Sequence, residues 1–591
     1  MANAADQQRL LLLPVALYRV LLPLSLLLTL YVVAMWRVAL PTYDVVDHHA
    51  FLAAAALGEL DWAGLWERHN GVHLIVLPKL VFWLDVYWLA GQGWLVTAVS
   101  ALAIAATLLL VLQQIQQFDG LTAHEQSLFA LLASLMLGSV LLAESLVNPI
   151  DIQWSLLALG TALVARGLMQ PWRASWPWWL AGLAISWLSS GPLPLMLLAL
   201  LLVYGLTGRQ HRQPNRWLSA PAVLPCLLGI FLLLAGREWL ALRQGWPLLL
   251  SHLYRPLVAA SDWAGMEAYL REDPAMYARW LGDAVSFVGR FVLVPAGHAW
   301  PWPWLVGLPL FIWLLAVQRS VLHWHAGQRF FVYLLLFPLL LALAAGWMRF
   351  FTLYNYRHAN MGLLLLLSSL LLVYGNARWR HKAAALALVL SAYGCQFAWA
   401  IIDEAGYWAW EGRNITRLLQ IGDALGIRDP AKFAPVWKDD PANPEAVANS
   451  RRVFREQRVG VYGTREYATY LGEIPLPSVE VTCEYRLHAL LQHAPDPRAF
   501  VVQAEARAAD GSYLTQAVLQ QDGHNVGWAA AQMPSDILWQ QWRQPWLFGG
   551  QLVLSQELTR DVSVIAFDRY RRCQPWPLPG LPAVDPVHHS P

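Results

Sequence analysis

The sequence predicts a mainly α-helical, polytopic membrane protein that ends in a smaller soluble domain rich in β-strands. Of the 591 residues, 57% are hydrophobic and only 14% are charged, and the mean hydropathy is +0.40. Such a composition is far from that of soluble chains. Long apolar stretches follow one another up to residue 403, after which the chain becomes polar and contains no stretch long enough to cross a bilayer.

Charge and motifs exclude several classes of protein. Lys and Arg number 41 and Asp and Glu 39, for a net charge of +2, so the chain lacks the basic excess of nucleic-acid-binding proteins. It also contains no P-loop, GxGxxG fingerprint, CxxC pair or HExxH motif, which leaves nucleotide hydrolysis, dinucleotide redox chemistry and zinc proteolysis without support. The 33 tryptophans fit either a belt at the membrane interface or stacking on sugars.

Eleven helical crossings are predicted from apolar stretches of suitable length. The stretch 74–89 is also apolar, but it carries Pro78, Lys79 and Asp85, so we expect an interfacial or re-entrant segment there. The first crossing is followed by no small-residue cleavage site and is expected to be an uncleaved anchor. The predicted crossings are 15–36, 92–115, 127–146, 150–168, 175–190, 192–207, 217–236, 303–318, 330–347, 359–375 and 383–402.

Clusters of basic residues in short loops predict the orientation. Lys and Arg gather at 208–216, 319–329 and 376–382, and such loops face the cytoplasm. With an odd number of crossings, everything after residue 403 then lies outside the cytoplasm. We therefore expect a bacterial inner-membrane protein with a periplasmic C-terminal domain, organised as a membrane domain (1–403), a connector (404–457) and a β-rich domain (458–591).

The C-terminal domain is expected to be a small antiparallel β-sandwich. Short runs of β-forming residues recur through it, and Asp510-Gly511 and Asp522-Gly523 stand where hairpins need turns. Of the four cysteines, Cys483 and Cys573 fall in this domain, whereas Cys226 and Cys395 fall in predicted crossings. In an oxidising periplasm a Cys483–Cys573 disulfide is the expected pairing, and two free thiols are the alternative.

Ionisable residues are dense just after the first crossing. Asp44 and Asp47 are three positions apart, so on a helix both carboxylates share one face. Such a pair can supply a general base for a hydroxyl group, or bind a divalent cation together with His48 or His49. The alternative is a solvated helix N-terminus with favourable acidic residues, and whether a metal is needed stays open.

Residues 43–100 resemble a group of multi-span bacterial membrane proteins with the pattern Asp-x-x-Asp, Trp, His-Asn-Glu-His-Arg and Arg-x-x-Phe-x-Leu-Asp. The group is similar to the GT-C superfamily of integral-membrane glycosyltransferases, in which an aspartate of the first extracytoplasmic loop is the catalytic base. The resemblance implies Asp44 or Asp47 as base, with Asp47 at the second Asp of the pattern. Gly71 stands where Glu is usual, and Lys79 where Arg is usual. Further matching residues are His69, Asn70 and, displaced by one position, His73.

Two later segments extend the resemblance. The run from Glu144 to Trp154 resembles a second signature of the group, with Asn148 followed by Gln153 and Trp154 at the start of a crossing. Arg357 and His358 stand at the head of a late crossing, where GT-C proteins are similar in carrying residues that hold the carrier phosphate. An arginine there can neutralise a phosphate, although interfacial snorkelling is the plain alternative. Lys79 is a third candidate for the phosphate.

The resemblance implies an enzyme that takes a sugar from a polyprenyl-phosphate donor and passes it, with inversion, to an extracytoplasmic hydroxyl group. The acceptor class includes O-antigen, other envelope polysaccharides and proteins such as pilin, and membrane arabinofuranosyltransferases resemble this layout. In the C-terminal domain we expect glycan recognition, with tryptophans as stacking surfaces or as core. The rival interpretations are a transporter or flippase of lipid-linked saccharides and a structural assembly protein. The tryptophans concerned are Trp528, Trp539, Trp542 and Trp546.

Overall fold

The structure is a computed structural model, and it describes part of the chain. The described residues form two compact units, one drawn from Met1–Val32, Trp62–Val81 and Leu95–Ala400, the other from Val33–Asp61, Phe82–Trp94 and Ile401–Pro591. Each unit is described separately below. The described residues are 20, 22–34, 54–59, 62–66, 74–118, 120–147, 151–207, 306–318, 324–348, 358–401, 452–463, 465–492, 499–514, 516–521, 523–532, 547–553 and 562–578, together with 282, 285, 288, 289 and 292.

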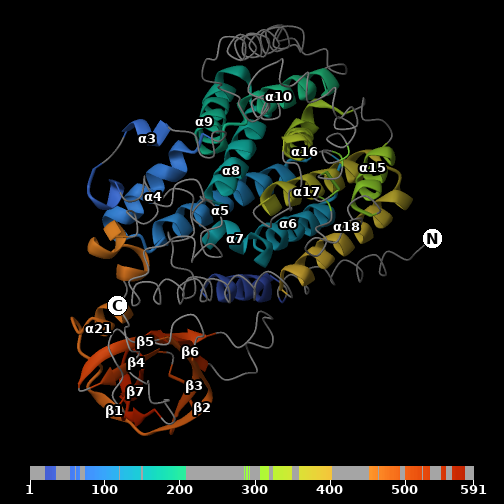
Figure 1. Ribbon diagram of the computed structural model, residues 1–591. Helices are drawn as coiled ribbons and strands as arrows, with labels where there is room; N and C mark the ends of the chain where they lie inside the picture. Colours follow the sequence, from blue (N-terminus) through green and yellow to red (C-terminus); the bar gives the residue numbers. More distant parts are fainter. Residues whose placement is uncertain are drawn as a thin grey trace, which may run out of the picture. The chain divides into compact units, whose positions relative to one another are not determined.

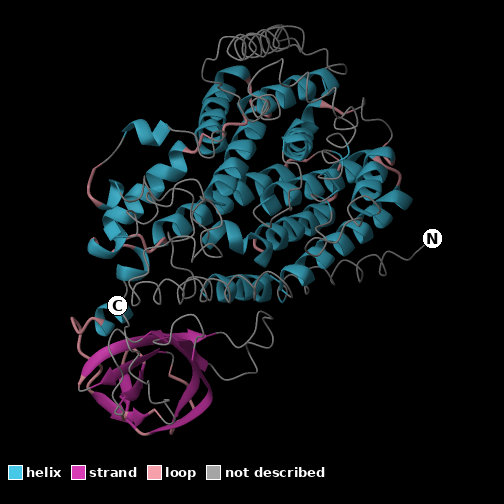
Figure 2. Ribbon diagram, viewed as in Figure 1, coloured by secondary structure: helices cyan, strands magenta, loops and turns pink. Residues whose placement is uncertain are grey.

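The first unit is helical (Figures 1 and 2). Its helix boundaries lie close to the predicted crossings, because long apolar runs end at polar, Gly or Pro positions. The predicted crossing 217–236 lies outside the described residues. The helices described between residues 22 and 399 include Leu22–Ala34, α3 (Trp62–Trp66), α4 (Val76–Leu89), α5 (Trp94–Gln116), α6 (Ala123–Leu137), α7 (Ala143–Val147), α8 (Ile152–Gly167), α9 (Trp172–Ser190), α10 (Leu193–Thr207), α15 (Leu308–Ala316), α16 (Arg329–Met348), α17 (Ala359–Asn376) and α18 (Trp379–Trp399).

Three helices in the described part are long and apolar enough to cross a membrane, by length and composition. They span Trp94–Gln116, Ala326–Ala345 and Ala359–Asn376. The total of eleven crossings stays a prediction. α17 is the central helix of its unit, since it contacts α6, α8, α15, α16 and α18 and is buried from Ala359 to Tyr374.

One predicted crossing, 127–146, is wrong as a continuous helix. α6 ends at Leu137, and a short 3₁₀ turn, η1 (Val140–Leu142), precedes α7. The break falls at Gly138, whose carbonyl oxygen accepts a hydrogen bond from the Thr29 hydroxyl at 3.0 Å. The hydroxyl of Ser139 accepts from the N–H of Leu141 and caps the new turn. Thr29 of the helix Leu22–Ala34 thus donates a hydrogen bond to the Gly138 carbonyl group, which has lost its partner within the helix because α6 ends there.

Described residues that adjoin the three basic segments lie at one end of the helical unit. Arg329 Nε donates to the Thr207 hydroxyl at 3.0 Å, which joins the start of α16 to the end of α10. Asn376 Nδ2 donates to Gln328 Oε1 at 3.3 Å, and Lys382 pairs with Glu125 at 3.8 Å. We call this the basic end. α5, α8, α10, α15 and α17 run toward it, and α6, α9, α16 and α18 run away from it.

α8 and α9 form a close antiparallel pair built on small residues. A Cβ added at Gly160 would lie 2.7 Å from the carbonyl oxygen of Gly182, and one at Gly182 would lie 2.5 Å from that of Gly160. Farther along, Gly167 abuts the ring of Trp179. Small residues let two backbones approach closely, which is a common means of packing helices in membranes.

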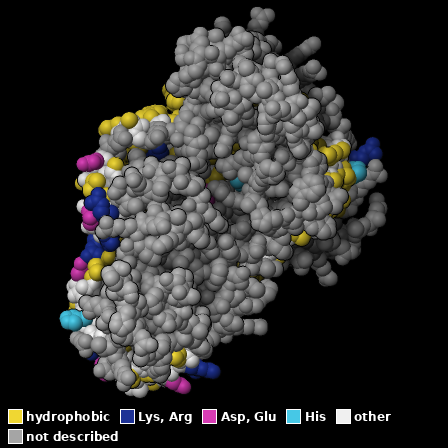
Figure 3. All heavy atoms as spheres, in the orientation of Figure 1, with side chains coloured by type: hydrophobic (Ala, Val, Ile, Leu, Met, Phe, Trp, Pro, Cys, Tyr) yellow, Lys and Arg dark blue, Asp and Glu magenta, His cyan; other side chains and the backbone are white. Residues whose placement is uncertain are grey.

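The apolar segment 74–89 forms the fourteen-residue helix α4, which is shorter than a bilayer crossing. The interfacial or re-entrant placement of this segment, expected from Pro78, Lys79 and Asp85, stays a prediction. Hydrophobic side chains lie on the surface at the left of Figure 3, where Figure 1 draws α3 and α4. α4 ends in a turn at Ala90 and Gly91, both with left-handed backbone (φ 49° and 70°).

The C-terminal domain contains one hydrogen-bonded sheet in the order β1-β8-β7-β4-β5-β6-β3-β2, with β9 paired to β7. All pairs are antiparallel except β1 with β8. The strands are β1 (Val479–Val481), β2 (Cys483–Gln492), β3 (Ala499–Ala508), β4 (Gln516–Gln521), β5 (His524–Gln532), β6 (Leu547–Val553), β7 (Val562–Phe567), β8 (Arg571–Cys573) and β9 (Trp576–Pro577).

The sheet curls so far that its two ends meet. β1 and β2 stand at opposite ends of the strand order, yet a single residue, Thr482, separates them in the chain. Figure 2 shows the strands wrapped around a common interior. The antiparallel β-sandwich expected from the sequence stays a prediction.

Small side chains fill the interior of this sheet. Its buried cluster includes Ala504, Ala506, Ala517 and Ala566, which leave room for a tightly curved sheet. Residues on the outer face of β4 and β7 are buried as well. They are Val518, Ile565 and Phe567, and Leu476 packs against them.

The expected disulfide is present. Cys483 at the start of β2 and Cys573 at the end of β8 are bonded, with their Cα atoms 5.5 Å apart. The disulfide therefore links β2, at one end of the strand order, to β8, the second strand from the other end. The β4–β5 hairpin turns at Gly523, with Gln521 paired to His524, and Gly511 turns the chain after β3. Both glycines have left-handed φ values of 79° and 83°, as the Asp-Gly pairs predict.

Candidate functional site

Both predicted catalytic residues, and most of the other predicted site residues, lie outside the described residues. Of the predicted site residues, the structure describes Lys79, Gln153, His358 and the two disulfide cysteines. Trp528 has a described backbone in β5, and the other three tryptophans of the predicted stacking surface do not. The predicted residues outside the described part are Asp44, Asp47, His48, His49, His69, Asn70, His73, Asn148 and Arg357.

Two motifs that are far apart in the sequence meet at the N-termini of α8 and α17. The rings of Trp154 and His358 are 4.4 Å apart between centroids, in an edge-to-face arrangement. Trp154 belongs to the first turn of α8, and His358 immediately precedes α17. His358 is 3% exposed. Gln153, the residue before Trp154 in the sequence, is also buried. The contact joins the Asn148–Trp154 signature to the Arg357–His358 element.

The meeting point of these helices is polar and buried. Asp151, which precedes α8, is 0% exposed, and Asn360 donates from Nδ2 to the Ser145 hydroxyl of α7 at 3.1 Å. Within the described part of the chain, Asn360 Oδ1 and Trp154 Nε1 have no hydrogen-bond partner. Buried polar atoms without partners are costly in a protein interior, so these two atoms are suited to receive groups of a bound molecule. We call Ser145, Asp151, Gln153, Trp154, His358 and Asn360 the polar cluster.

The polar cluster lies at the end of the helical unit opposite the basic end, since α8 and α17 both run from it toward the basic loops. At the same end, α9 finishes beside the start of α8. Trp187 near the end of α9 has its ring 6.5 Å from that of Trp66 in α3. The carbonyl oxygen of Gly64 in α3 accepts a hydrogen bond from Lys79 Nζ at 2.5 Å. Lys79 is therefore at the same end as the polar cluster.

The electrostatics of the two helix starts differ. Backbone N–H groups make the N-terminus of a helix positive, and Asp151 stands at the N-cap position of α8, although its side chain makes no capping hydrogen bond. The start of α17 carries His358 and no carboxylate in its first turn. An anion is therefore better accommodated at α17, where Arg357 precedes the helix in the sequence.

Asp151 and Ser145 were not among the predicted site residues. A signal for Asp151 exists in the sequence, because an ionisable residue beside a predicted crossing marks a functional position more often than a structural one. Ser145 has no comparable signal, since only the folded chain brings α7 against α17.

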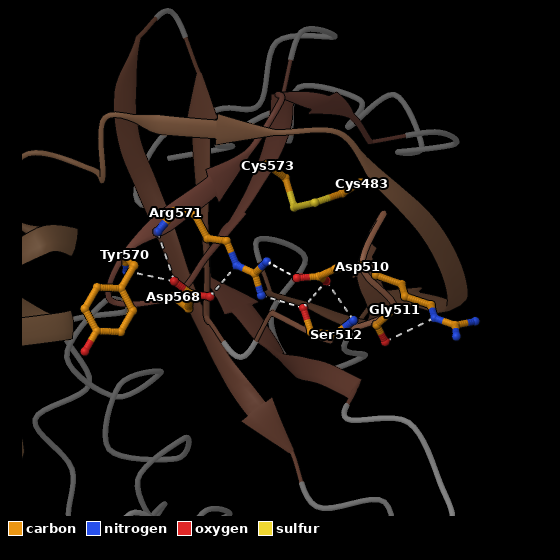
Figure 4. Close-up of polar contacts among 9 residues, drawn as sticks. Cys483, Asp510, Gly511, Ser512, Asp568, Tyr570, Arg571 and Cys573 are labelled. Atoms are coloured by element: carbon orange, nitrogen blue, oxygen red, sulfur yellow. Dashed lines mark hydrogen bonds and ion pairs between the residues drawn. A yellow bond between two sulfur atoms is a disulfide. The ribbon is translucent and has the colours of Figure 1, made fainter.

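The second unit holds an exposed polar network (Figure 4). Arg571 at the start of β8 donates to Asp568 at 2.9 Å, to Asp510 at 2.6 Å and to the Ser512 hydroxyl at 2.5 Å. Hydrogen bonds from the hydroxyl and N–H of Ser512, and then from Arg571, hold the pKa of Asp510 well below its usual value. The network ties the turn after β3 to the β7–β8 turn.

Among the described residues no group of three or more His, Cys, Asp or Glu side chains is arranged to hold a metal ion. The residues considered for a divalent cation, Asp44, Asp47 and His48, lie outside that part of the chain. Comparison of the chain with protein-family models, curated proteins and solved structures found no match. The structure itself defines a mostly helical protein with membrane-type helices and a small C-terminal sheet domain.

Proposed function

We propose that this protein is an integral-membrane glycosyltransferase of the GT-C type, which uses a polyprenyl-phosphate-linked sugar as donor and an extracytoplasmic glycan or protein hydroxyl group as acceptor. The observation that carries the proposal is the contact of Trp154 with His358. It unites two segments whose separate resemblance to GT-C signatures led to the expectation of a carrier-phosphate site.

In the proposed reaction, Asp47 or Asp44 takes the proton from the acceptor hydroxyl group. The acceptor oxygen attacks the anomeric carbon of the sugar, a new glycosidic bond forms, and the bond from that carbon to the phosphate oxygen breaks. Polyprenyl phosphate leaves with the electron pair of that bond, and its charge is stabilised by Arg357 and the start of α17. A single displacement inverts the anomeric configuration.

The polar cluster supports this proposal through its position and its unpaired atoms. It lies at the end of the helical unit opposite the basic loops, which are expected to face the cytoplasm. Asn360 Oδ1 and Trp154 Nε1 provide one acceptor and one donor for sugar or phosphate oxygens. The edge of a buried indole beside His358 is also a suitable wall for a sugar ring.

The disulfide supports a periplasmic C-terminal domain. Cys483 and Cys573 are both buried in the interior of the sheet, and disulfides persist in oxidising compartments. In the proposed arrangement this domain lies on the periplasmic side, where an acceptor glycan or protein is presented.

Activity measurements with the purified protein test the proposal. Decaprenyl-phosphoryl arabinose and a polyprenyl-phosphate hexose serve as alternative donors, each with a periplasmic glycan acceptor, and release of polyprenyl phosphate is the readout. Asp47→Asn or Asp44→Asn is expected to reduce turnover by about 10²–10⁴-fold, the contribution of a general base. Glu456→Gln removes an exposed carboxylate of the α-helical turn before β1 and serves as the matched control.

Two results would contradict the proposal. Full turnover in both aspartate variants would remove the catalytic assignment, and absence of transfer from every donor class would remove the enzyme class. Movement of intact donor across a vesicle membrane without transfer would instead support a flippase.

A further inference from the structure

Helix α4 differs in two respects from a helix on the surface of a soluble protein. Its ionisable residues are inside, with Lys79 2% and Asp85 0% exposed. Two aromatic residues near its C-terminal end are outside, with Tyr87 65% and Trp88 64% exposed, whereas Phe82 is buried. On a soluble surface Lys and Asp are almost never buried and large apolar side chains are covered.

The buried polar groups of α4 have partners within the protein. Lys79 Nζ donates to the Gly64 carbonyl oxygen at 2.5 Å. Asp85 accepts from the N–H of Gly93 at 2.5 Å through its side chain, and from the N–H of Gly91 at 3.1 Å through its backbone. Internal satisfaction of charged groups is what a helix requires where water is scarce on its outer side.

The exposed aromatic face continues into a helix able to cross the membrane. Trp94, the first residue of α5, is exposed, and so are Leu102 and Leu109 farther along α5. The 23 residues of α5 correspond to about 34 Å at the helical rise, close to the thickness of a bilayer's apolar core. Trp94 therefore stands at the level of the lipid headgroups, where tryptophan and tyrosine gather.

We propose that Tyr87, Trp88, Leu89 and Trp94 form a lipid-binding surface at the boundary between headgroups and acyl chains. We call these four residues the aromatic patch. The occupant is the bilayer itself, because Trp94 is the first residue of α5, a helix long and apolar enough to cross a membrane, and three of the four residues carry amphipathic rings. This inference does not depend on the proposed enzymatic activity.

The loop behind the aromatic patch belongs to the same compact unit as the C-terminal domain. The N–H of Gly460 donates to the Ala90 carbonyl oxygen at 2.9 Å, and Gln92 Nε2 donates to the Gly460 carbonyl oxygen at 2.8 Å. Gly460 has a left-handed backbone (φ 63°), and the turn after Leu89 is also left-handed. Anchoring of the patch in lipid therefore holds the first segment of the C-terminal unit at the membrane surface.

Depth-dependent fluorescence quenching tests the proposal on the full chain. In a Cys226→Ser/Cys395→Ser background, Trp88→Cys or Trp94→Cys is labelled with bimane and placed, one copy per disc, in nanodiscs of phosphatidylcholine and phosphatidylglycerol. The matched control is Tyr570→Cys, an exposed aromatic position on the β7–β8 turn. Labels at 88 and 94 are expected to emit at shorter wavelength than the control and to lose most of their emission to nitroxide-labelled phosphatidylcholine.

Quenching of labels 88 and 94 by aqueous iodide to the same extent as label 570, without quenching by the lipid-borne nitroxide, would overturn the proposal. Because each disc holds one copy, protection from both quenchers would also overturn it, since the patch would then be covered by protein. The two labelled positions belong to different helices, so a folding defect in one variant leaves the other as an independent test.

Discussion

The indole of Trp154 contacts the imidazole of His358 edge to face, with 4.4 Å between ring centroids. The contact lies where α8 and α17 begin, so the starts of these helices are side by side. Both helices run from this point toward the basic end. It is thus a local reporter of the geometry of the polar cluster.

Replacement of Trp154 by Leu is expected to weaken donor binding. Loss of the ring contact costs about 0.5–1.5 kcal/mol beyond burial, so we expect KM for the donor to rise up to tenfold. Trp179→Leu is the matched control, because Trp179 is also buried and pairs edge to face with Tyr204, near the basic end. Both variants lose thermal stability, and equal effects on KM would refute a role of the cluster in donor binding.

The close approach of α8 and α9 predicts that Gly160→Ala destabilises the protein. The added Cβ would meet the backbone carbonyl of Gly182, which is unable to move aside as a side chain would. Overpacking of this kind costs about 1–3 kcal/mol, measurable as a lower Tm in detergent. Gly205→Ala in α10, where no atom lies within 4 Å of the new Cβ, is expected to leave Tm unchanged or higher.

Lys79→Met is expected to separate α3 from α4. The variant removes the hydrogen bond from a buried cation to Gly64, a loss of about 1.5–3 kcal/mol. Lys79→Arg keeps the charge and a donor, and matches the residue usual in the GT-C pattern. Hydrogen exchange of the segment around Gly64 is expected to rise in Lys79→Met and much less in Lys79→Arg; equal protection in both would contradict this role.

The disulfide is expected to stabilise the curled sheet strongly. It joins residues that are 90 apart in sequence, and removal of such a native bond costs about 2–5 kcal/mol. The Cys483→Ser/Cys573→Ser variant should therefore unfold its sheet domain at lower temperature, measured by proteolysis of that domain during heating. The Cys395→Ser variant, which removes an exposed free thiol, is the control and should behave as wild type.

The low pKa of Asp510 predicts an acid-dependent stability. A carboxylate whose folded pKa is depressed contributes stability above its unfolded pKa and loses that contribution as the pH falls toward the folded value. The difference in Tm between wild type and Asp510→Asn should therefore be present at neutral pH and shrink below about pH 4, the ordinary aspartate pKa. A difference that stays constant down to the lowest accessible pH would show that the charge of Asp510 is not responsible.

Parts of this protein could be predicted because they depend on short stretches of chain. Apolar runs of sufficient length predicted the bounds of α5, α8, α10 and α17 to within a few residues, and Asp-Gly pairs predicted the turns at Gly511 and Gly523. The cysteine pairing followed from there being two cysteines in the polar part of the chain.

Other parts depend on contacts between distant segments. The sequence by itself determined helical spacing, charge asymmetry and the disulfide, since composition and local geometry suffice for these. Only the tertiary structure decided that α6 is interrupted at Gly138, that the sheet curls until β1 meets β2, and that Asn360 bonds to Ser145 rather than to a neighbour in its own helix. Each of these rests on a backbone or side-chain group being satisfied by a residue far away in the chain, and no local pattern encodes such a partner.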